Sequence, residues 1–415
     1  MVVDGGGAAV AVVVMVVREY DAKKDCKAVE QMENRCEVGP SDKLGLYTDL
    51  LGDPICRVRN SPAHLMLVAE MVVVGGGEDR ERREIVGTIR GTIKTVTRGT
   101  KFMKNGNNCS IYTKLAYILG LRVSPYHRRM GIGLNLVRKM EGWFRESGAE
   151  YSYMATEIDN EASVNLFTTK CGYAKFRTPS IMVRPVFAHR IRIDKRATVI
   201  KLGAADAESL YRRRFASNEF FPRDIDAVLS NRLNLGTYLA VPKGSYDAAS
   251  WPGTREFLAS QPDSWAVLSV WNCKDVYKLE IRGASRVRKT LAKATRMADR
   301  ALPWLHLPSV PELFKPFGFH FLYGLGGHGP NSVKLTKALC GWAHNLAKEH
   351  GCEVVATEVA RLEPLRLGIP HWRSLSCAED LWCIKRLRED YSDGSVGDWT
   401  KSPPGLSIFV DPREV

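Results

Sequence analysis

Two arginines stand directly before a glycine-rich turn and a helix, in a pattern suited to binding phosphate. Arg128 and Arg129 are followed by Gly131 and Gly133, and apolar residues then recur at helical spacing up to Phe144. Cations at a helix N-terminus oppose the helix dipole and cost about 0.3–1 kcal/mol each. They become favourable when an anion lies between them and the free N–H groups of the first turn. Because glycine lets an anion approach the backbone closely, the pattern predicts a pyrophosphate cradle.

Hydrophobic patterns predict the elements that position this cradle. Before it we expect a strand over 10–19, helices over 22–36 and 42–51, and a hairpin of strands 63–74 and 84–97. The cradle joins a strand over 113–123 to a helix over 129–147. After it we expect a strand over 150–157, a helix over 160–170 and strands near 173–187. The order is therefore β-α-α-β-β-β-α-β-α-β.

This order and two motifs resemble the GCN5-related N-acetyltransferase (GNAT) family. The first motif, R-x-x-G-x-G at 128–133, follows a strand reading L-x-V-x-P, as in the acyl-CoA loop of that family. The second motif, N-x-x-S-x-x-L-F-x-x-K-C-G-Y at 160–173, resembles the family's N-x-x-A-x-x-L-Y-x-x-x-G-F. The resemblance implies an α/β fold (an α+β mixed sheet) that splays between its fourth and fifth strands to admit CoA. It also implies acetyl-CoA as co-substrate and an amine as acceptor, with no metal.

By the same resemblance, certain residues contact acetyl-CoA. They are Leu121, Arg122, Val123, Arg128, Arg129, Met130, Gly131, Ile132, Gly133, Leu134, Asn160 and Phe167. The backbone of the first three would follow the pantetheine arm, and the loop would wrap the pyrophosphate. Core packing is the alternative role for Leu121 and Val123, and helix capping is the alternative for Asn160.

Transfer to an amine also needs a base, because a lysine ammonium has a pKa near 10.4. Glu157 closes the predicted strand 150–157, where acceptors enter in GNAT enzymes, so it is the candidate to accept the proton directly or through water. A structural role is the alternative, because Glu358 repeats it in the second half. Phe167 departs from the family, which often has a tyrosine there to protonate the leaving thiolate. General acid catalysis contributes about 10²–10⁴-fold, so the loss weakens transfer unless Tyr151, Tyr153 or water replaces it.

The second half of the chain repeats short motifs of the first half in the same order. The matched pairs are Gly142-Trp143 with Gly341-Trp342, Ala155-Thr156-Glu157 with Ala356-Thr357-Glu358, and Ser180-Ile181-Met182-Val183 with Ser407-Ile408-Phe409-Val410. The segment 322–329 stands where the phosphate loop should be, but it lacks the arginine pair and is followed by Pro330.

This repeat indicates a duplicated domain rather than a solenoid. We expect residues 10–190 to form the acetyltransferase domain, 191–200 a basic linker, and 201–415 a degenerate second copy. An unrelated α/β domain is the alternative for the second half.

Longer stretches in both halves resemble one branch of the family, the plant hookless N-acetyltransferases. They include 35–70, 148–167, 264–275, 319–330 and 377–387. This resemblance implies a role in hormone-controlled plant growth, action in the nucleus, and protein lysine, in histones above all, as acceptor.

Composition limits the other function classes. The 415 residues carry a net charge of +14, which suggests anionic partners. Ten cysteines without C-x-x-C spacing, and no secretory leader, indicate reduced thiols in an intracellular protein; no zinc cluster is apparent. The apolar run 8–17 is too short to span a bilayer and suggests a buried first strand, so no membrane partner is expected.

Two other functions remain open. A non-catalytic CoA-binding or scaffolding regulator would explain Phe167. A nucleic-acid-associated protein would use the basic segment 282–300, whose cations could otherwise form a solvated helical face.

Overall fold

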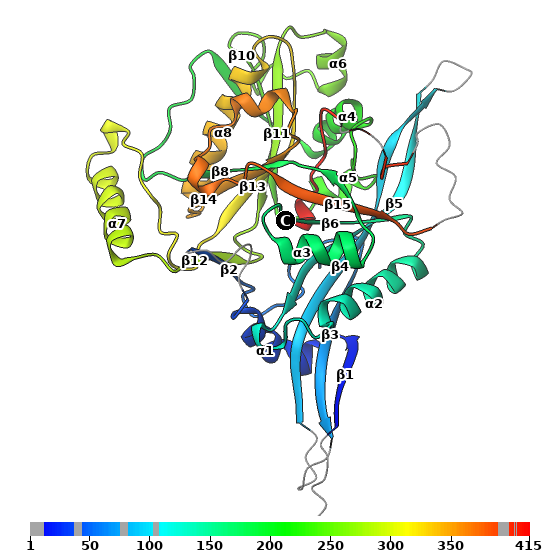
Figure 1. The fold of residues 1–415 in the computed structure, drawn as a ribbon. Coiled ribbons are helices and arrows are strands. Elements are labelled where there is room, and N and C mark those ends of the chain that lie inside the picture. The colour runs from blue at the N-terminus through cyan, green and yellow to red at the C-terminus, as the bar shows by residue number, and fades with distance from the viewer. Residues whose placement is uncertain are drawn as a thin grey trace, which may run out of the picture.

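The computed structural model describes residues 12–36, 44–74, 82–102, 108–388, 398–401, 403 and 405–415, and contains two large mixed sheets (Figure 1). The first sheet has the order β1 (Val12–Glu19), β3 (Ala63–Val74), β4 (Arg82–Phe102), β5 (Asn108–Val123), β6 (Tyr151–Glu157), β15 (Asp380–Arg386) and β7 (Ala174–Arg177). The second has the order β8 (Ser180–Pro185), β14 (Val354–Val359), β13 (Phe319–His328), β11 (Trp265–Asn272), β10 (Asn234–Pro242) and β9 (Ala197–Leu202).

Helices cover and connect these sheets. They are α1 (Ala22–Glu33), α2 (Ile132–Glu146), α3 (Glu161–Asn165), α4 (Ala204–Phe215), α5 (Ile225–Leu229), α6 (Thr254–Ala259), α7 (Arg286–Ala301) and α8 (Ser332–Glu349). Shorter helical turns are η1 (Pro125–His127), η2 (Leu166–Lys170), η3 (Pro303–Leu305), η4 (Pro364–Gly368), η5 (Arg373–Leu375) and η7 (Pro412–Glu414). Within the described ranges, none of the helices combines the length and apolar character needed to cross a bilayer.

The two halves exchange strands. β15, from the end of the chain, pairs with β6 in the first sheet, whereas β8, from the first half, pairs with β14 in the second. The sheets therefore cross the predicted boundaries of 10–190 and 201–415, and that division into folding units stays a prediction. The predicted linker 191–200 also runs into the strand β9.

A small ribbon joins the halves a third time. β2 (Gly45–Asp49) pairs antiparallel with β12 (Lys278–Arg282), so the helix expected over 42–51 is wrong. The physical reason is tertiary: a short apolar run cannot distinguish strand from helix, and the partner strand that decides the matter is distant in sequence.

Both sheets splay at equivalent positions, as the internal repeat predicts. β5 pairs parallel with β6 only over Leu115–Ile118, and β13 pairs parallel with β14 only over Phe319–Leu322. Two residues later each strand has a left-handed glycine, Gly120 with φ 60° and Gly324 with φ 62°. Only glycine adopts this conformation without steric cost, and each glycine marks the point where the strands separate.

The third motif match of the repeat is wrong as a structural equivalence. β8 holds the place beside β14 that β15 holds beside β6, so the counterpart of Ser180–Pro185 is Asp380–Arg386. Residues 407–410 form no paired strand beyond an isolated bridge between Glu219 and Ile408.

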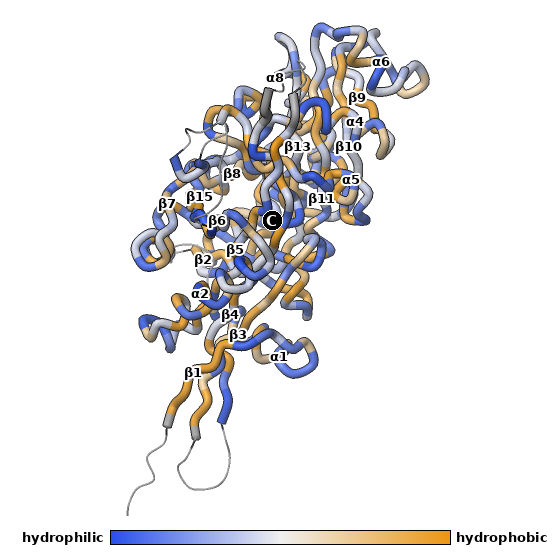
Figure 2. Tube along the Cα trace, turned by 90° about the vertical axis from the view of Figure 1, so that its right-hand side faces the viewer, coloured by the Kyte–Doolittle hydropathy of each residue, from blue (hydrophilic) through white to orange (hydrophobic). Residues whose placement is uncertain are grey.

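The C-terminal segment lies in the middle of the molecule, as Figures 1 and 2 both show. Lys94 of β4 forms buried ion pairs with Glu414 and Asp411. Arg413 pairs with Asp411 and Asp224. A hydrophobic core that joins residues of both halves surrounds this cluster. Because buried charges must be paired, the cluster ties the C-terminal segment to the first sheet.

The other predicted elements are confirmed within a few residues, except that β1 is not buried. It is an edge strand, and Val13 and Val14 are 54% and 46% exposed. The nine cysteines whose side chains the structure describes are free thiols.

Candidate active site

The predicted pyrophosphate cradle forms an exposed loop before α2. Gly131 is the N-cap of the helix with φ 76°, and Arg129 is also left-handed with φ 65°. Such a conformation costs a non-glycine residue about 1–2 kcal/mol, and it is maintained here at a surface turn. Residues 128–131 are exposed, and neither arginine has an ion-pair partner within the described part of the chain. The free N–H groups of the first helical turn and both cations are therefore available to one anion.

Side chains around the loop alternate between core and solvent. Ile132 is buried in the core beneath α2, and Leu121, Val123 and Leu134 pack against that core. Met130 is 56% exposed. Gly133 lies opposite Leu166, whose Cδ2 would be 3.4 Å from an added Cβ. The core role of Leu121 and Val123 is thus confirmed, and their backbones remain at the edge of the splay.

A cavity of about 440 Å³ lies where β5 and β6 separate. Its walls come from both halves, because the ribbon β2–β12 and the strands β13, β14 and β15 all contribute residues. Of the predicted site residues, Arg122, Glu157 and Asn160 line it. The volume lies within the roughly 300–1,000 Å³ typical of small-molecule sites.

Three acidic side chains meet at one end of this cavity. Glu157 is the register partner of Asp380 across β6 and β15, and Glu358 lies at the equivalent position of β14. Burial, and then the charge of Glu157, raise the pKa of Asp380 to about 7. Burial, and then Asp159, raise the pKa of Glu157. Burial, and then Asp380, raise the pKa of Glu358 well above its usual range.

This acidic group is suited to moving protons. Carboxyls with pKa values near neutrality are poised for general base catalysis. No group of three or more His, Cys, Asp or Glu among the described residues is arranged to bind a metal ion. The indole Nε1 of Trp382 donates a hydrogen bond to Glu358 Oε1 at 2.8 Å, which fixes one member of the group.

Sequence reasoning missed Asp380 and Glu358 as site residues. The segment 377–387 shows the resemblance to the hookless branch, but its placement beside Glu157 depends on the strand exchange. Glu358 could have been found from its motif match to Glu157, because the splayed ends of both sheets face one cavity.

Asn160 and Phe167 differ in their placement. Asn160 lines the cavity and also caps α3, since its Oδ1 accepts a hydrogen bond from the Ser163 N–H at 3.2 Å. Phe167 is only 1% exposed and packs edge-on against Tyr173 at 5.2 Å between ring centroids. It does not line the cavity.

Two tyrosines stand nearer to the reaction space than Phe167. Tyr117 and Tyr153 both line the cavity and stack at 4.4 Å between ring centroids. The Tyr153 hydroxyl donates to Glu414 at 2.6 Å. Tyr151 instead accepts a hydrogen bond from Arg98 away from the cavity. Sequence analysis named Tyr153 as a substitute acid but did not identify Tyr117.

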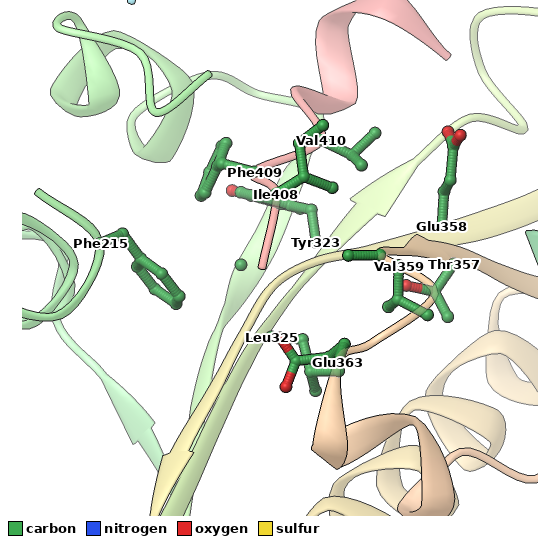
Figure 3. A pocket seen from close by; sticks show the side chains of 12 residues that line it. Phe215, Tyr323, Leu325, Thr357, Glu358, Val359, Glu363, Ile408, Phe409 and Val410 are labelled. Carbon is green, nitrogen blue, oxygen red and sulfur yellow. The ribbon is translucent and has the colours of Figure 1, made fainter. Parts of the chain in front are cut away.

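The equivalent gap in the second half is filled by the chain itself. Ile408, Phe409 and Val410 lie beside Tyr323 of β13, with Thr357 and Val359 on the neighbouring strand (Figure 3). Phe409 is 2% exposed and contacts a cluster of aromatic rings. The remaining cavity is about 20 Å³, which is room for about one water molecule.

The glycines around the second helix start are tightly packed. An added Cβ at Gly329 would lie 1.7 Å from the carbonyl oxygen of Asp263. At Gly368 of η4 it would lie 2.4 Å from the carbonyl oxygen of Val333, in the first turn of α8. The start of α8 itself is exposed at Pro330 and Asn331, but its loop lacks the arginine pair of the first half.

The basic segment 282–300 forms most of α7, which projects from the edge of the molecule (Figure 1). Arg296 pairs with Glu353, but Arg286, Arg288, Lys289 and Lys293 are exposed. Val287 and Leu291 on the same helix are 76% and 64% exposed. This helix does not line the large cavity.

Comparisons with known proteins agree with this geometry. A family model described as "Acetyltransferase (GNAT) family" matches residues 49–173. "Probable N-acetyltransferase HLS1-like" of Arabidopsis thaliana is 65% identical over 416 residues, which cover 97% of this chain and 99% of the relative. "Acetyl transferase GW6a" of Oryza sativa subsp. japonica is 39% identical over 435 residues, which cover 96% of this chain and 97% of the relative.

A solved structure also shows the same fold. Saccharomyces cerevisiae N-myristoyltransferase with bound myristoyl-CoA superposes with a TM-score of 0.50 at 12% identity. The match covers 90% of this chain and 79% of that chain. At this identity the likeness concerns the fold alone.

Proposed function

Because the chain belongs to the GNAT acetyltransferases and shares its whole length with the HLS1-like proteins, we propose that it transfers acetyl from acetyl-CoA to an amine within a ternary complex. It is an acyltransferase by family. One observation supports the proposed mechanism most strongly. The open helix start with its arginine pair comes just after β5, and the acid-lined cavity is lined by β5 and β6 where these strands separate.

In this proposal the residues of the loop and strand hold the donor. Arg128, Arg129 and the first-turn N–H groups of α2 bind the pyrophosphate. The backbone of residues 121–123 lies along the pantetheine arm, and acetyl-CoA supplies the reactive thioester. Asn160 is committed to its cap and can contact the arm only with its remaining hydrogen-bonding atoms.

The acidic pair handles the proton. As the amine nitrogen bonds to the thioester carbonyl carbon and the carbon–sulfur bond breaks, Glu157 or Asp380 accepts the proton that the nitrogen loses. The charge of Glu157 helps to raise the pKa of Asp380, after burial, so Asp380 is the carboxyl that ionises near pH 7. The thiolate leaves without a tyrosine at position 167, and a free thiol has a pKa near 8.5, which makes it a tolerable leaving group. Tyr117 lines the cavity and can donate a hydrogen bond there.

The biological setting follows from the named relatives and the resemblance. We propose protein lysine, including histone lysine, as one acceptor class, with action in the nucleus and a role in plant growth regulation. The net charge of +14 would repel a basic histone tail, so acceptance would depend on the local acidity of the site.

Binding and turnover test the proposal separately. Calorimetry with acetyl-CoA and with a non-hydrolysable analogue measures donor binding, and release of free thiol with a panel of amines measures transfer. We expect binding at one site and thiol release that depends on the amine. Binding without thiol release on any amine would favour the CoA-binding regulator. The buried Phe167 agrees with that function, because phenylalanine cannot protonate the leaving thiolate. Donor binding retained in an Arg128→Ala, Gly131→Glu variant would refute the site itself.

The exposed cations of α7 support a second candidate role, contact with nucleic acid. Binding of a DNA duplex should weaken as salt rises, and it should disappear when the α7 cations are neutralised. Equal binding by wild type and the neutralised variant would refute this role. No aromatic residue lies within α7, so base stacking is not part of this candidate role.

A further inference from the structure

Arg57 is a cation that the protein does not neutralise. It lines the large cavity, and its Nε is buried without a hydrogen-bond partner. Within the described residues its guanidinium contacts the ring of Tyr277, 5.0 Å from the ring centroid, and has no carboxylate partner. Arg90, by contrast, pairs with Glu33 at 2.8 Å. A buried guanidinium N–H without a partner is costly, so its presence beside a cavity indicates an anionic ligand group.

Negatively charged side chains line the same cavity as Arg57. Glu157 and Asp380 line it and have no ion-pair partner among the described residues. Tyr117, which also lines the cavity, lies within electrostatic range of both Arg57 and Asp380. The two poles of charge therefore belong to one small space and are not separate surface features.

An apolar surface accompanies these charges. The second half contributes Leu279, Leu313, Phe317, Phe319 and Phe321, and the ring of Tyr277 lies beside Arg57. A ligand that satisfied all three features would have an amine, an anionic group and an apolar or aromatic body. The flexible, hydrophilic surroundings of a lysine in a basic protein tail offer neither the anion nor the apolar body.

We propose, resting on the acetyltransferase function above, that this cavity takes a further acceptor class, a small amino carboxylate with an apolar or aromatic side chain. Its amine lies at Glu157 and Asp380, its body lies against Phe317, Phe319 and Phe321, and its carboxylate pairs with Arg57. The acetyl group passes to the amine nitrogen, whose proton goes to the acidic pair, and the products are the N-acetylated carboxylate and free CoA. The donor pyrophosphate does not compete for Arg57, because it binds at the exposed start of α2.

The test compares acceptors that differ only in charge. Thiol release from acetyl-CoA is measured with phenylalanine, phenylalaninamide, phenethylamine and a histone-tail peptide, for wild type, Arg57→Met and Arg59→Met. Arg59 is a matched control on the same turn, because its side chain is 52% exposed and pairs with Asp53. A charged hydrogen bond in a desolvated site corresponds to about tenfold to hundredfold in kcat/KM.

We expect wild type and Arg59→Met to prefer phenylalanine over its amide by that factor. In Arg57→Met the ratio should fall to about one, whatever the absolute rates, and a purely structural role of Arg57 would leave the ratio unchanged. Equal rates with phenylalanine and its amide in wild type, or turnover on the histone peptide alone, would overturn the proposed acceptor class. The absence of thiol release with every amine would instead overturn the acetyltransferase function.

Discussion

Asp380 lies directly across the sheet from Glu157, although one comes from the last strand of the chain and the other from the sixth. Like charges at facing positions of neighbouring strands are destabilising, so sheets without a functional site rarely keep them. Here the pair borders a cavity, and burial together with the neighbouring charge holds the pKa of Asp380 near 7. This geometry leads to the first two predictions.

The rate of transfer should rise with pH through an apparent pKa near 7. Asp380→Asn should remove this limb, because Asp380 is the carboxyl whose pKa is raised to about 7. Glu157→Gln should lower kcat/KM by about 10²–10⁴-fold, the usual contribution of a general base. Profiles of kcat/KM against pH, measured with two acceptors of different amine pKa, separate the enzyme's ionisation from that of the substrate. Glu379→Gln is the matched control. The proposal fails if the rate of Asp380→Asn rises with pH through the same apparent pKa as that of wild type.

The same pair should make stability depend on pH. The pKa of Asp380 is raised on folding from 3.8 to about 7, so the folded state binds more protons than the unfolded state in that interval. Its contribution to stability is therefore fully present below about pH 4 and is lost as pH rises through 7. Urea unfolding at pH 5 and pH 8 should show a smaller loss of unfolding free energy in Asp380→Asn than in wild type. An identical loss in both proteins would contradict the assignment.

The loop arginines should act on the phosphates of the donor alone. Replacing Arg128 or Arg129 with alanine should weaken acetyl-CoA binding by about tenfold to hundredfold, the value of one charged hydrogen bond. Binding of S-acetyl-pantetheine, which has no pyrophosphate, should not change. Calorimetry measures both, and Lys139→Ala on the exposed face of α2 is the control. Equal losses with both ligands would indicate a damaged fold rather than a lost phosphate contact.

The second half should not bind a donor. Phe409→Ala should lower the free energy of unfolding by about 3–5 kcal/mol, since it removes a buried ring from an aromatic cluster. The loop before α8 still lacks the arginine pair of the first half, so acetyl-CoA should bind at one site per chain in wild type and variant. A stoichiometry of two in either protein would show that the second splay is functional.

The buried ion pairs should hold the halves together. Lys94→Met leaves the carboxylates of Glu414 and Asp411 without their shared cation, which costs about 3–5 kcal/mol. Lys24→Met removes a surface ion pair with Asp21, in which the Lys24 side chain is 80% exposed, and should cost less than about 1 kcal/mol. Denaturant unfolding measures both values. Similar effects for the two variants would mean that the buried cluster does not stabilise the assembly of the sheets.

The sequence by itself determined what depends on neighbours along the chain. The arginines, glycines and amphipathic pattern at 128–144 predict a helix start that can bind an anion, and the structure has that helix start in the open. Two of the three duplicated motifs likewise predict two related sheets, since both copies of each lie within one strand or helix. Capping by Asn160 is a local contact and could be anticipated for the same reason.

Tertiary structure decided the acceptor end of the site. Strand pairing depends on backbone hydrogen bonds between distant segments, and no local pattern shows that β15 lies beside β6 or β2 beside β12. That exchange brings Asp380 to Glu157, places Ile408 and Phe409 in the second splay, and turns the apolar face of β13 toward Arg57. The donor loop thus depends on one short segment of the chain, 128–133. The charged residues proposed to select the acceptor come together only where the two halves pack against each other.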